Sequence, residues 1–232
     1  MTSAARPVFL FDVDNTLLDN DRVSADLKQY LTNHVGQERQ RRYWTLFEEL
    51  RAELGYADYL GALQLYRTEN PRDPNLLAVS EFLVEYYFAN RLFPNSLDVL
   101  DHVSQWGQPA ILSDGDVVFQ PRKIRRSGLF DGVKGNVLIY VHKEHELDDV
   151  RQRYPADHYV LVDDKIRILT AVKKIWGGDV TTVFVRQGHY ALDPKIIEAY
   201  PPADLSIERI GDLMQYGLED FMAASSKSLV RG

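Results

Sequence analysis

Two pairs of aspartates stand directly after short apolar runs in this chain of 232 residues. Asp12 and Asp14 follow "VFLF", and Asp163 and Asp164 follow "YVLV". Carboxylates placed side by side repel one another, and burial raises that cost. We therefore expect a hard cation to compensate for their charge, and ligands that are all oxygen, without Cys or His, favour Mg²⁺.

The elements that must position these aspartates are short buried strands alternating with helices. Apolar runs predict strands at Val8–Asp12, Pro109–Leu112, Val137–Val141, Tyr159–Val162 and Thr181–Val185, with a weaker one at Asp204–Ile207. Intervening stretches predict helices at Asp98–Trp106, Glu146–Tyr154 and Ile166–Trp176. This alternation indicates an α/β fold with a Rossmann-like parallel sheet and helices on both faces.

Ligands of such open sheets bind outside the carboxyl ends of the strands. Both aspartate pairs lie at such ends, and so does Ser113, which follows "PAIL". If the three strands are neighbours, four carboxylates and one hydroxyl converge on one site.

Residues 19–92 interrupt the pattern of strands. Apolar side chains recur there at helical spacing, namely Trp44, Phe47, Leu50, Leu54, Tyr59, Leu63 and Tyr66. We interpret this stretch as an all-helical cap domain inserted after the first strand. The core domain then comprises residues 1–18 and 93–232.

Composition narrows the class of protein further. The formal net charge of −7 argues against binding to nucleic acid, which needs a basic surface. The chain contains no cysteine, which excludes disulfides and thiolate metal sites within it and suits a reducing compartment. No signal peptide or membrane-spanning run is visible. A cytoplasmic protein without membrane contact is the expectation, and monomer and homodimer both stay open.

At this point the sequence resembles the haloacid dehalogenase-like (HAD) superfamily. Asp12-Val-Asp14-Asn-Thr16, Ser113, Lys143 and Asp163-Asp164 are similar to its four ordered motifs. The resemblance runs from about Val8 to Leu213 and includes the position of the helical cap. It implies a Rossmann-like core, Mg²⁺ and an aspartyl-phosphate intermediate.

The chemistry of these residue types agrees with that resemblance. Carboxylates act as nucleophiles toward phosphoryl groups, so Asp12 would attack phosphorus. Asp14 would serve as general acid and then general base, and its main-chain carbonyl would, by resemblance, bind the metal. Asp163 would bind Mg²⁺ directly, with Asp164 as its close partner. The expected substrate-binding residues are Thr16, Ser113, Asp114 and Lys143.

The third motif has two candidate lysines. Lys143, 20 residues before Asp163, follows a strand and is the preferred one, although Glu144 stands where the family often has proline. Lys123 is the competitor, and we interpret it as part of a solvated helix face. The family often has Asn at position 114 and another Asp or Asn at 168, where this chain has Asp114 and Ile168. The fourth motif is therefore a reduced form, which places more demand on Asp164.

Other readings of single segments are weaker. "DVDNTLLDNDRV" begins like a calcium-binding EF-hand loop but lacks its glycine and its final glutamate. The cluster His142–Glu146 could suggest zinc, but a solvated helix start explains it better. Residues 188–190 are expected to form a turn at a strand end, and the tail 223–232 is expected to fray.

The function expected from the sequence is Mg²⁺-dependent hydrolysis of a small-molecule phosphomonoester. A 2-haloacid dehalogenase and a phosphomutase are rival enzymes on the same fold. Asp14 counts against the dehalogenase, because displacement of halide needs no proton donor. A ligand-binding or regulatory module without turnover is the rival from another class.

Overall fold

Six parallel strands form the sheet at the centre of the protein. The computed structural model describes residues 6–229 and shows the strands in the order β3-β2-β1-β4-β5-β6. Their bounds are β1 Val8–Phe11, β2 Gln108–Asp114, β3 Val137–Tyr140, β4 Tyr159–Asp163, β5 Val180–Val185 and β6 Leu205–Ile207. All the predicted strands are present, and the weak run near Asp204 is the edge strand β6. Because β1 lies between β2 and β4, the three strands that end in candidate site residues are neighbours.

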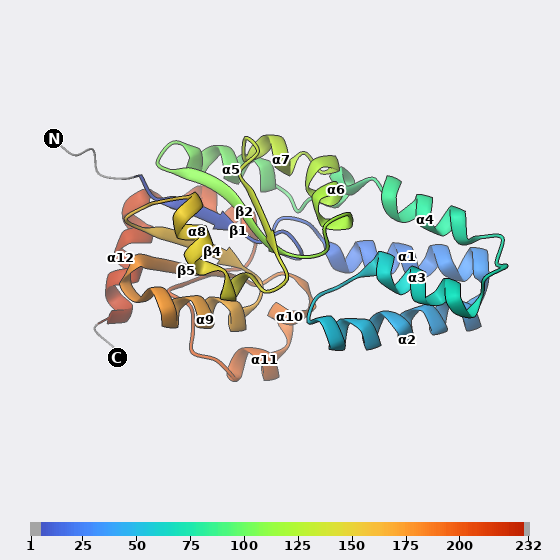
Figure 1. Ribbon diagram of the computed structural model, residues 1–232. Helices are drawn as coiled ribbons and strands as arrows, with labels where there is room; N and C mark the ends of the chain where they lie inside the picture. Colours follow the sequence, from blue (N-terminus) through green and yellow to red (C-terminus); the bar gives the residue numbers. More distant parts are fainter. Residues whose placement is uncertain (1–5, 230–232) are drawn as a thin grey trace.

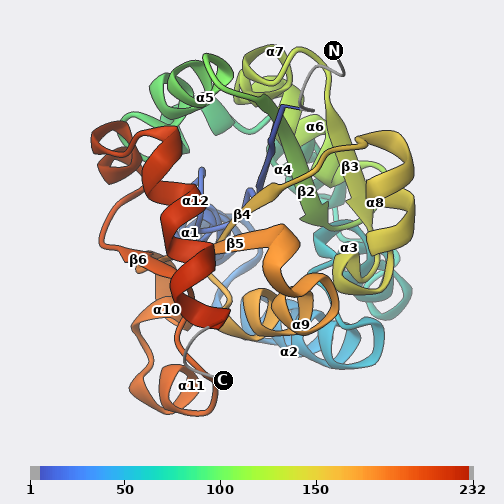
Figure 2. The ribbon, with the colours of Figure 1, turned by 90° about the vertical axis from the view of Figure 1, so that its left-hand side faces the viewer.

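Helices cover both faces of the sheet, which confirms the predicted α/β fold class (Figures 1 and 2). α5 (Ser96–Ser104), α7 (Leu129–Gly132) and α12 (Leu218–Leu229) cover one face, and α8 (Leu147–Arg153) and α9 (Ile166–Trp176) cover the other. Successive residues of a strand point to opposite faces. Phe9 and Phe11 of β1 therefore belong to one apolar cluster, and Val8 and Leu10 belong to the other.

The stretch predicted to be a helical insert forms four helices and one 3₁₀ turn. These are α1 (Asn20–Val35), α2 (Gln37–Leu54), α3 (Tyr59–Glu69), α4 (Leu76–Glu85) and η1 (Phe88–Arg91). Asp19 caps α1 by accepting a hydrogen bond from the Arg22 amide, and Asp58 caps α3 through the Gly61 amide. Gly55 ends α2 in the left-handed conformation that glycine adopts readily. Helices α1–α4, which we call the cap, lie beyond the carboxyl ends of the strands (Figure 1).

The chain leaves the sheet and returns to it at one crossing. The Asp19 amide donates to the Arg91 carbonyl at 2.7 Å, and the Phe93 amide donates to the Leu17 carbonyl at 3.0 Å. Ser96 adds a hydroxyl bond of 2.7 Å to the same Leu17 carbonyl. We propose that this crossing is the limit between a core domain of residues 1–18 and 93–232 and a cap domain of residues 19–92.

Several shorter elements depart from the sequence-based expectations. Residues Gly188–Leu192 form helix α10 where a turn was expected. Helix α12 continues to Leu229, so the predicted fraying is wrong for that part of the tail, and residues 230–232 lie outside the described range. The remaining elements are α6 (Phe119–Arg126), η2 (Lys143–His145), η3 (Gly177–Asp179), α11 (Pro194–Glu198) and η4 (Ile210–Gln215).

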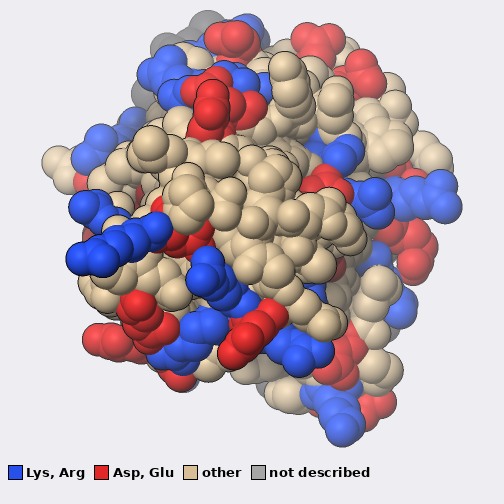
Figure 3. All heavy atoms as spheres, turned by 90° about the vertical axis from the view of Figure 1, so that its right-hand side faces the viewer, with Lys and Arg blue, Asp and Glu red and all other residues tan. Residues whose placement is uncertain are grey.

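The far end of the cap carries charges of both signs. In Figure 3, which faces this end of the molecule, Lys and Arg alternate with Asp and Glu around a neutral centre. Ion pairs within the cap include Arg42 with Glu69 at 2.5 Å and Arg39 with Asp73 at 3.0 Å. Among the described residues, no helix combines the length and the apolar character needed to cross a bilayer.

The packing of β4 leads to a test of the core. Leu161 is fully buried among residues that join the sheet to α8 and α9. We expect Leu161→Ala to lower the free energy of unfolding by about 2–5 kcal/mol, because it removes apolar contacts and leaves a cavity. Ile175→Ala, at a position 62% exposed, is the control and should change it by less than about 0.5 kcal/mol. Urea denaturation of both variants measures the difference, and equal losses would contradict this packing.

Candidate active site

Asp12 and Asp163 share one buried lysine at the ends of neighbouring strands. Lys143 Nζ lies 2.5 Å from Asp12 Oδ1 and 2.7 Å from Asp163 Oδ2. It also donates to the Leu112 carbonyl at 3.2 Å. The three side chains are almost completely buried. The structure thus brings Lys143 to the aspartates, as preferred for the third motif, and the solvated-helix interpretation of residues 142–146 is wrong for it. Glu144 is buried as well, paired with Arg167 at 2.6 Å.

The Asp164 side chain lies beside this pair, and its carboxyl group has no hydrogen-bonding partner among the described residues. Its amide donates to Thr16 Oγ1 at 3.0 Å, and Thr16 Oγ1 lies 3.4 Å from Asp12 Oδ2. Both carboxyl oxygens of Asp164 are buried and receive no hydrogen bond from the described residues. A buried carboxylate left without partners is costly, so its environment calls for a proton or a cation.

The pKa values in this cluster reflect burial and like charge. Burial raises the pKa of Asp163 to about 6, although Lys143 acts in the opposite direction. Burial also raises the pKa of Asp164 well above its usual range, and the neighbouring Asp163 and Asp12 add to the shift. Burial alone would lower the pKa of Lys143, but Asp12 and Asp163 more than offset it and raise that pKa. The lysine is therefore charged, while the carboxyls compete for positive charge.

This set of oxygens fits a divalent metal. Carboxylate oxygens of Asp12, Asp163 and Asp164 lie within 4.8 Å of one another, and all three residues are buried. Mg²⁺ prefers oxygen ligands and is often held by one or two carboxylates together with water. The two unpartnered oxygens of Asp164 are the feature that such an ion would satisfy. The Asp14 carboxylate is not among these three.

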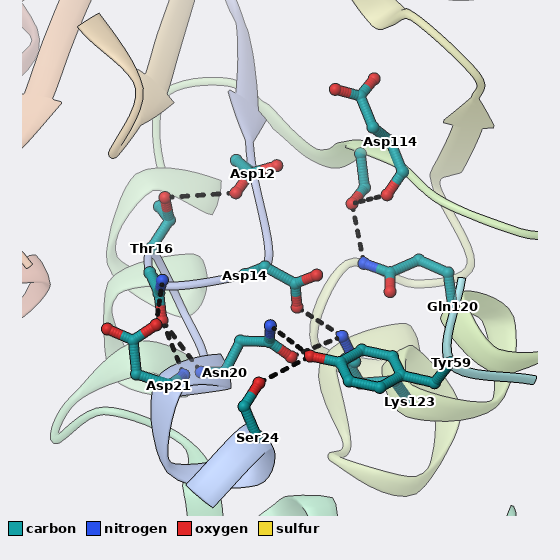
Figure 4. A network of polar contacts seen from close by, with 12 residues as sticks. Asp12, Asp14, Thr16, Asn20, Asp21, Ser24, Tyr59, Asp114, Gln120 and Lys123 are labelled. Carbon is teal, nitrogen blue, oxygen red and sulfur yellow. Dashed lines mark hydrogen bonds and ion pairs between the residues drawn. The ribbon is translucent and has the colours of Figure 1, made fainter. Parts of the chain in front are cut away.

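Asp14 instead turns toward the cap side, where Lys123 meets it. Lys123 Nζ lies 2.6 Å from Asp14 Oδ1 and donates to Asn20 Oδ1 at 3.0 Å (Figure 4). Lys123 is 1% exposed, so its interpretation as part of a solvated helix face is wrong. Helix α6 presents this lysine to the site while its Phe119 packs against Tyr59 and Phe88. Both candidate lysines are in the site, each paired with a different aspartate of the first motif.

Ser113 and Asp114 end β2 on the same side of the sheet. Ser113 Oγ accepts a hydrogen bond of 2.9 Å from Gln120 and lies 3.3 Å from the Asp114 carbonyl. Asp114 Oδ1 accepts the Lys143 amide at 2.7 Å, so this carboxylate orders the turn that carries the lysine. Burial raises the pKa of Asp114. Asp114 therefore helps to position Lys143, a contact that the sequence does not predict. Its substrate-binding role stays an expectation from the sequence.

A cavity of about 620 Å³ lies between the strand ends and the cap. Asp14, Asp114 and Lys165 line its core side, and Ser24, Trp44 and Arg51 are among the cap residues that line it. A cavity of this size is in the range of small-molecule sites. Asp14 and Lys165 are close in sequence to the buried aspartates Asp12 and Asp164, so the cavity lies next to the aspartate cluster, and residues of the cap supply more than half of its lining.

Sequence patterns missed several residues of this cavity. Gln120, Asn20 and Tyr59 contact site residues or one another, but each lies in a helix without a recognisable motif. Lys165 follows Asp164 directly and lines the cavity, and the pKa of Lys165 is raised because Asp164 and Asp12 outweigh its burial. The signal that could have found Lys165 is its adjacency to the second aspartate pair.

His189 lies in the segment 188–190, which the sequence predicts as a turn. Its amide and its Nδ1 contact the Asp21 carboxylate at 2.9 and 2.6 Å, which ties α10 to the start of α1. Burial would raise the pKa of Asp21, but hydrogen bonds from His189 and Asn15 lower it. Gly188 is required at this contact, because a Cβ there would lie 2.4 Å from the Cβ of Asn15.

The family model of haloacid dehalogenase-like hydrolases matches residues 7–175. A solved structure from Burkholderia xenovorans LB400, described as a haloacid dehalogenase-like hydrolase, is 61% identical, with a TM-score of 0.88. That match covers 92% of this chain and 99% of the other. No curated protein matches the sequence.

Two more distant structures share the fold. The hydrolase YfnB from Bacillus subtilis, bound to magnesium, is 16% identical with a TM-score of 0.59, and the match covers 91% of this chain and 98% of that one. L-2-haloacid dehalogenase from Xanthobacter autotrophicus, with chloropropionic acid covalently bound, is 18% identical with a TM-score of 0.59. That match covers 90% of this chain and 97% of the other. At these identities the likeness concerns the fold alone.

The raised pKa values predict how stability depends on pH. The pKa of Asp163 is about 6 in the folded protein and about 3.9 in an unfolded chain, so the folded state holds the proton more tightly. In a chelating buffer, the contribution of Asp163 to the free energy of unfolding should be highest below about pH 4. It should be lost as the pH rises from about 4 to about 6. Added Mg²⁺ should reverse the fall by binding the ionised carboxylates.

Asp164→Asn provides the matching variant. It removes a buried carboxyl without partners, so it should reduce both the loss of stability with rising pH and the gain from Mg²⁺. Asp101→Asn, at an exposed position on α5, should change neither. Thermal denaturation between pH 4 and 8, with and without Mg²⁺, measures both effects. Identical profiles for the Asp164 variant and the native chain would contradict the assigned cause.

Proposed function

Because the chain belongs to the haloacid dehalogenase-like hydrolase family, we propose that this hydrolase cleaves small-molecule phosphomonoesters through an aspartyl-phosphate on Asp12. One observation carries the proposal, namely the buried carboxylates of Asp163 and Asp164 beside Asp12, with the oxygens of Asp164 left unpartnered. Such a cluster calls for a cation, which hydrolysis of a phosphate ester uses and displacement of a halide does not need. Asp12, Asp163, Asp164 and the main chain of Asp14 would hold the metal.

In the first step, the Asp12 carboxylate attacks phosphorus, and the bond from phosphorus to the ester oxygen breaks. Lys143, 2.5 Å from Asp12, orients the nucleophile and offers positive charge to the phosphoryl group. Asp14 lies two residues further on and lines the cavity, where it donates a proton to the departing ester oxygen. When bound, Mg²⁺ would neutralise charge on the phosphoryl oxygens.

In the second step, water attacks phosphorus of the aspartyl-phosphate. Asp14, having lost its proton, accepts one from that water, and the Asp12 carboxylate is released together with inorganic phosphate. Ser113, near the end of β2, and Thr16, in the turn after β1, would bond phosphoryl oxygens through their hydroxyls. The cap would limit the access of bulk water during transfer.

The size of the cavity supports a small substrate. It is about 620 Å³, and the cap forms one wall, so a macromolecular substrate would have to displace α1 and α2. We propose a phosphorylated metabolite as the partner of this site. A panel of such compounds, assayed for release of phosphate, identifies the preferred ester.

The test compares two reactions on one enzyme. We expect release of p-nitrophenol from p-nitrophenyl phosphate to require Mg²⁺ and to fall to background in Asp12→Asn, because the amide cannot act as nucleophile. Halide release from 2-chloropropionate in a chelating buffer, with no Mg²⁺-dependent phosphatase activity, would overturn the proposal in favour of a 2-haloacid dehalogenase. Transfer of the phosphoryl group to a second substrate instead of water would indicate a phosphomutase.

The variant Asp14→Asn distinguishes proton transfer by Asp14 from nucleophilic attack by Asp12. We expect it to lower kcat by about 10²- to 10⁴-fold, the usual contribution of a general acid or base. The aspartyl-phosphate on Asp12 should persist longer in this variant, because activation of water is lost. Acid quenching followed by mass spectrometry detects the adduct, and an unchanged lifetime would argue against Asp14 as the base. Asp101→Asn, at an exposed position on α5, is the control.

A further inference from the structure

Helix α6 connects the site with the cap through side chains on two of its faces. Toward the site, Gln120 bonds Ser113 at 2.9 Å and Lys123 pairs with Asp14 at 2.6 Å. Toward the cap, Arg126 pairs with Glu85 of α4 at 2.9 Å. Arg122 also pairs with Glu85 and bonds the carbonyl of Val84. A displacement of α4 relative to the sheet would therefore act on the helix that carries Lys123.

A second route joins Lys123 to the cap through Asn20. Lys123 donates to Asn20 Oδ1 at 3.0 Å, and Asn20 Nδ2 donates to the Tyr59 hydroxyl at 3.3 Å. The Tyr59 hydroxyl lies 2.7 Å from Ser24 Oγ (Figure 4). Tyr59 is 2% exposed, and burial raises the pKa of its hydroxyl to about 12, so this group stays protonated. The contacts form a continuous chain from Asp14 to helices α1 and α3.

We propose that Lys123 is a positioning residue that keeps the Asp14 carboxylate on the leaving-group side of the cavity. Through the contacts of Asn20 and Tyr59, this positioning requires that the cap stay packed against the core as it is in this structure. The inference rests on the proposed function. Lys143 holds Asp12 and Asp163 on the strand side, so each aspartate of the first motif has its own lysine. A buried ion pair fixes geometry because breaking it leaves an uncompensated charge.

This arrangement has a chemical consequence for the first step. Lys123 binds Oδ1 of Asp14, which leaves Oδ2 to carry the proton taken from water in the second step of the previous turnover. Asp14 donates this proton to the ester oxygen, so its position matters most when the leaving group departs poorly. Phenolate is a poor leaving group and p-nitrophenolate is a good one, and the two esters are similar in size. Loss of the Lys123 contact should therefore slow cleavage of phenyl phosphate more than cleavage of p-nitrophenyl phosphate.

The kinetic experiment measures kcat/KM for both esters in the native enzyme and in Lys123→Met. We expect a loss of about 10²-fold on phenyl phosphate and of less than about tenfold on p-nitrophenyl phosphate. Lys123→Arg keeps the cation and should recover part of the difference. Tyr59→Phe should show the same direction of selectivity with a smaller loss. Lys174→Met and Tyr87→Phe, at exposed positions, are the matched controls.

Equal losses on the two esters would overturn the proposal, because a merely structural lysine would affect both alike. If the native enzyme cleaves neither ester, the proposed function is wrong. A crystal structure of Lys123→Met then still tests the placement of Asp14, which should leave its native position while Asp12, Lys143 and Asp163 keep theirs. If Lys123→Met does not fold, crystal structures of Asn20→Ala and Tyr59→Phe take its place, because both variants retain the lysine. In these structures Lys123 or Asp14 should move from its native position. An unmoved Asp14 in all three variants would overturn the inference.

Discussion

The structure depends on how buried negative charge is balanced where the neighbouring strands β1 and β4 end. Asp12, Asp163 and Asp164 lie within a few ångströms of one another, and Lys143 neutralises only part of their charge. Carboxylates in an interior are stable only with protons, cations or hydrogen bonds. The remaining demand for positive charge makes this site suited to a divalent ion and to a phosphoryl group stabilised by it.

The sheet creates this concentration of charge through its strand order. β1 lies between β2 and β4, and all the strands are parallel, so their carboxyl ends meet at one edge. Crossover connections leave β1 and its neighbours in opposite directions at this point, which opens a crevice. The apolar clusters on the two faces of the sheet fix the registers between neighbouring strands. The positions of the polar residues that follow the strands are fixed with them.

The sequence allowed most of the sheet and its aspartates to be predicted, because buried strands are continuous apolar runs and Asp12 and Asp163 follow them directly. Lys143 could be chosen from its place after such a run. Lys123 could not, since helix α6 has a polar sequence, "FQPRKIRR", and its buried side depends on contacts with Asp14 and the cap that lie more than 30 residues away. Gln120, Asn20 and Tyr59 were missed for the same reason. The spacing of apolar residues predicts which helix faces are buried against the sheet. It does not predict which distant residues cover the charged face of a helix.

The crossing of the two linkers affects how the cap and the core can change in evolution. The chain departs after Leu17 and returns at Phe93 through adjacent backbone bonds, so the backbone of the 74 residues numbered 19–92 leaves and re-enters the core at one place. Side chains such as Asn20 and Glu85 add contacts with α6. Because the two linkers are hydrogen-bonded to each other, a change of length inside that stretch need not alter where the chain leaves and re-enters the core. Recognition of new compounds can therefore diversify by changes within one contiguous block of sequence, provided that Asn20 and Tyr59 keep the contacts that hold Lys123 and Asp14.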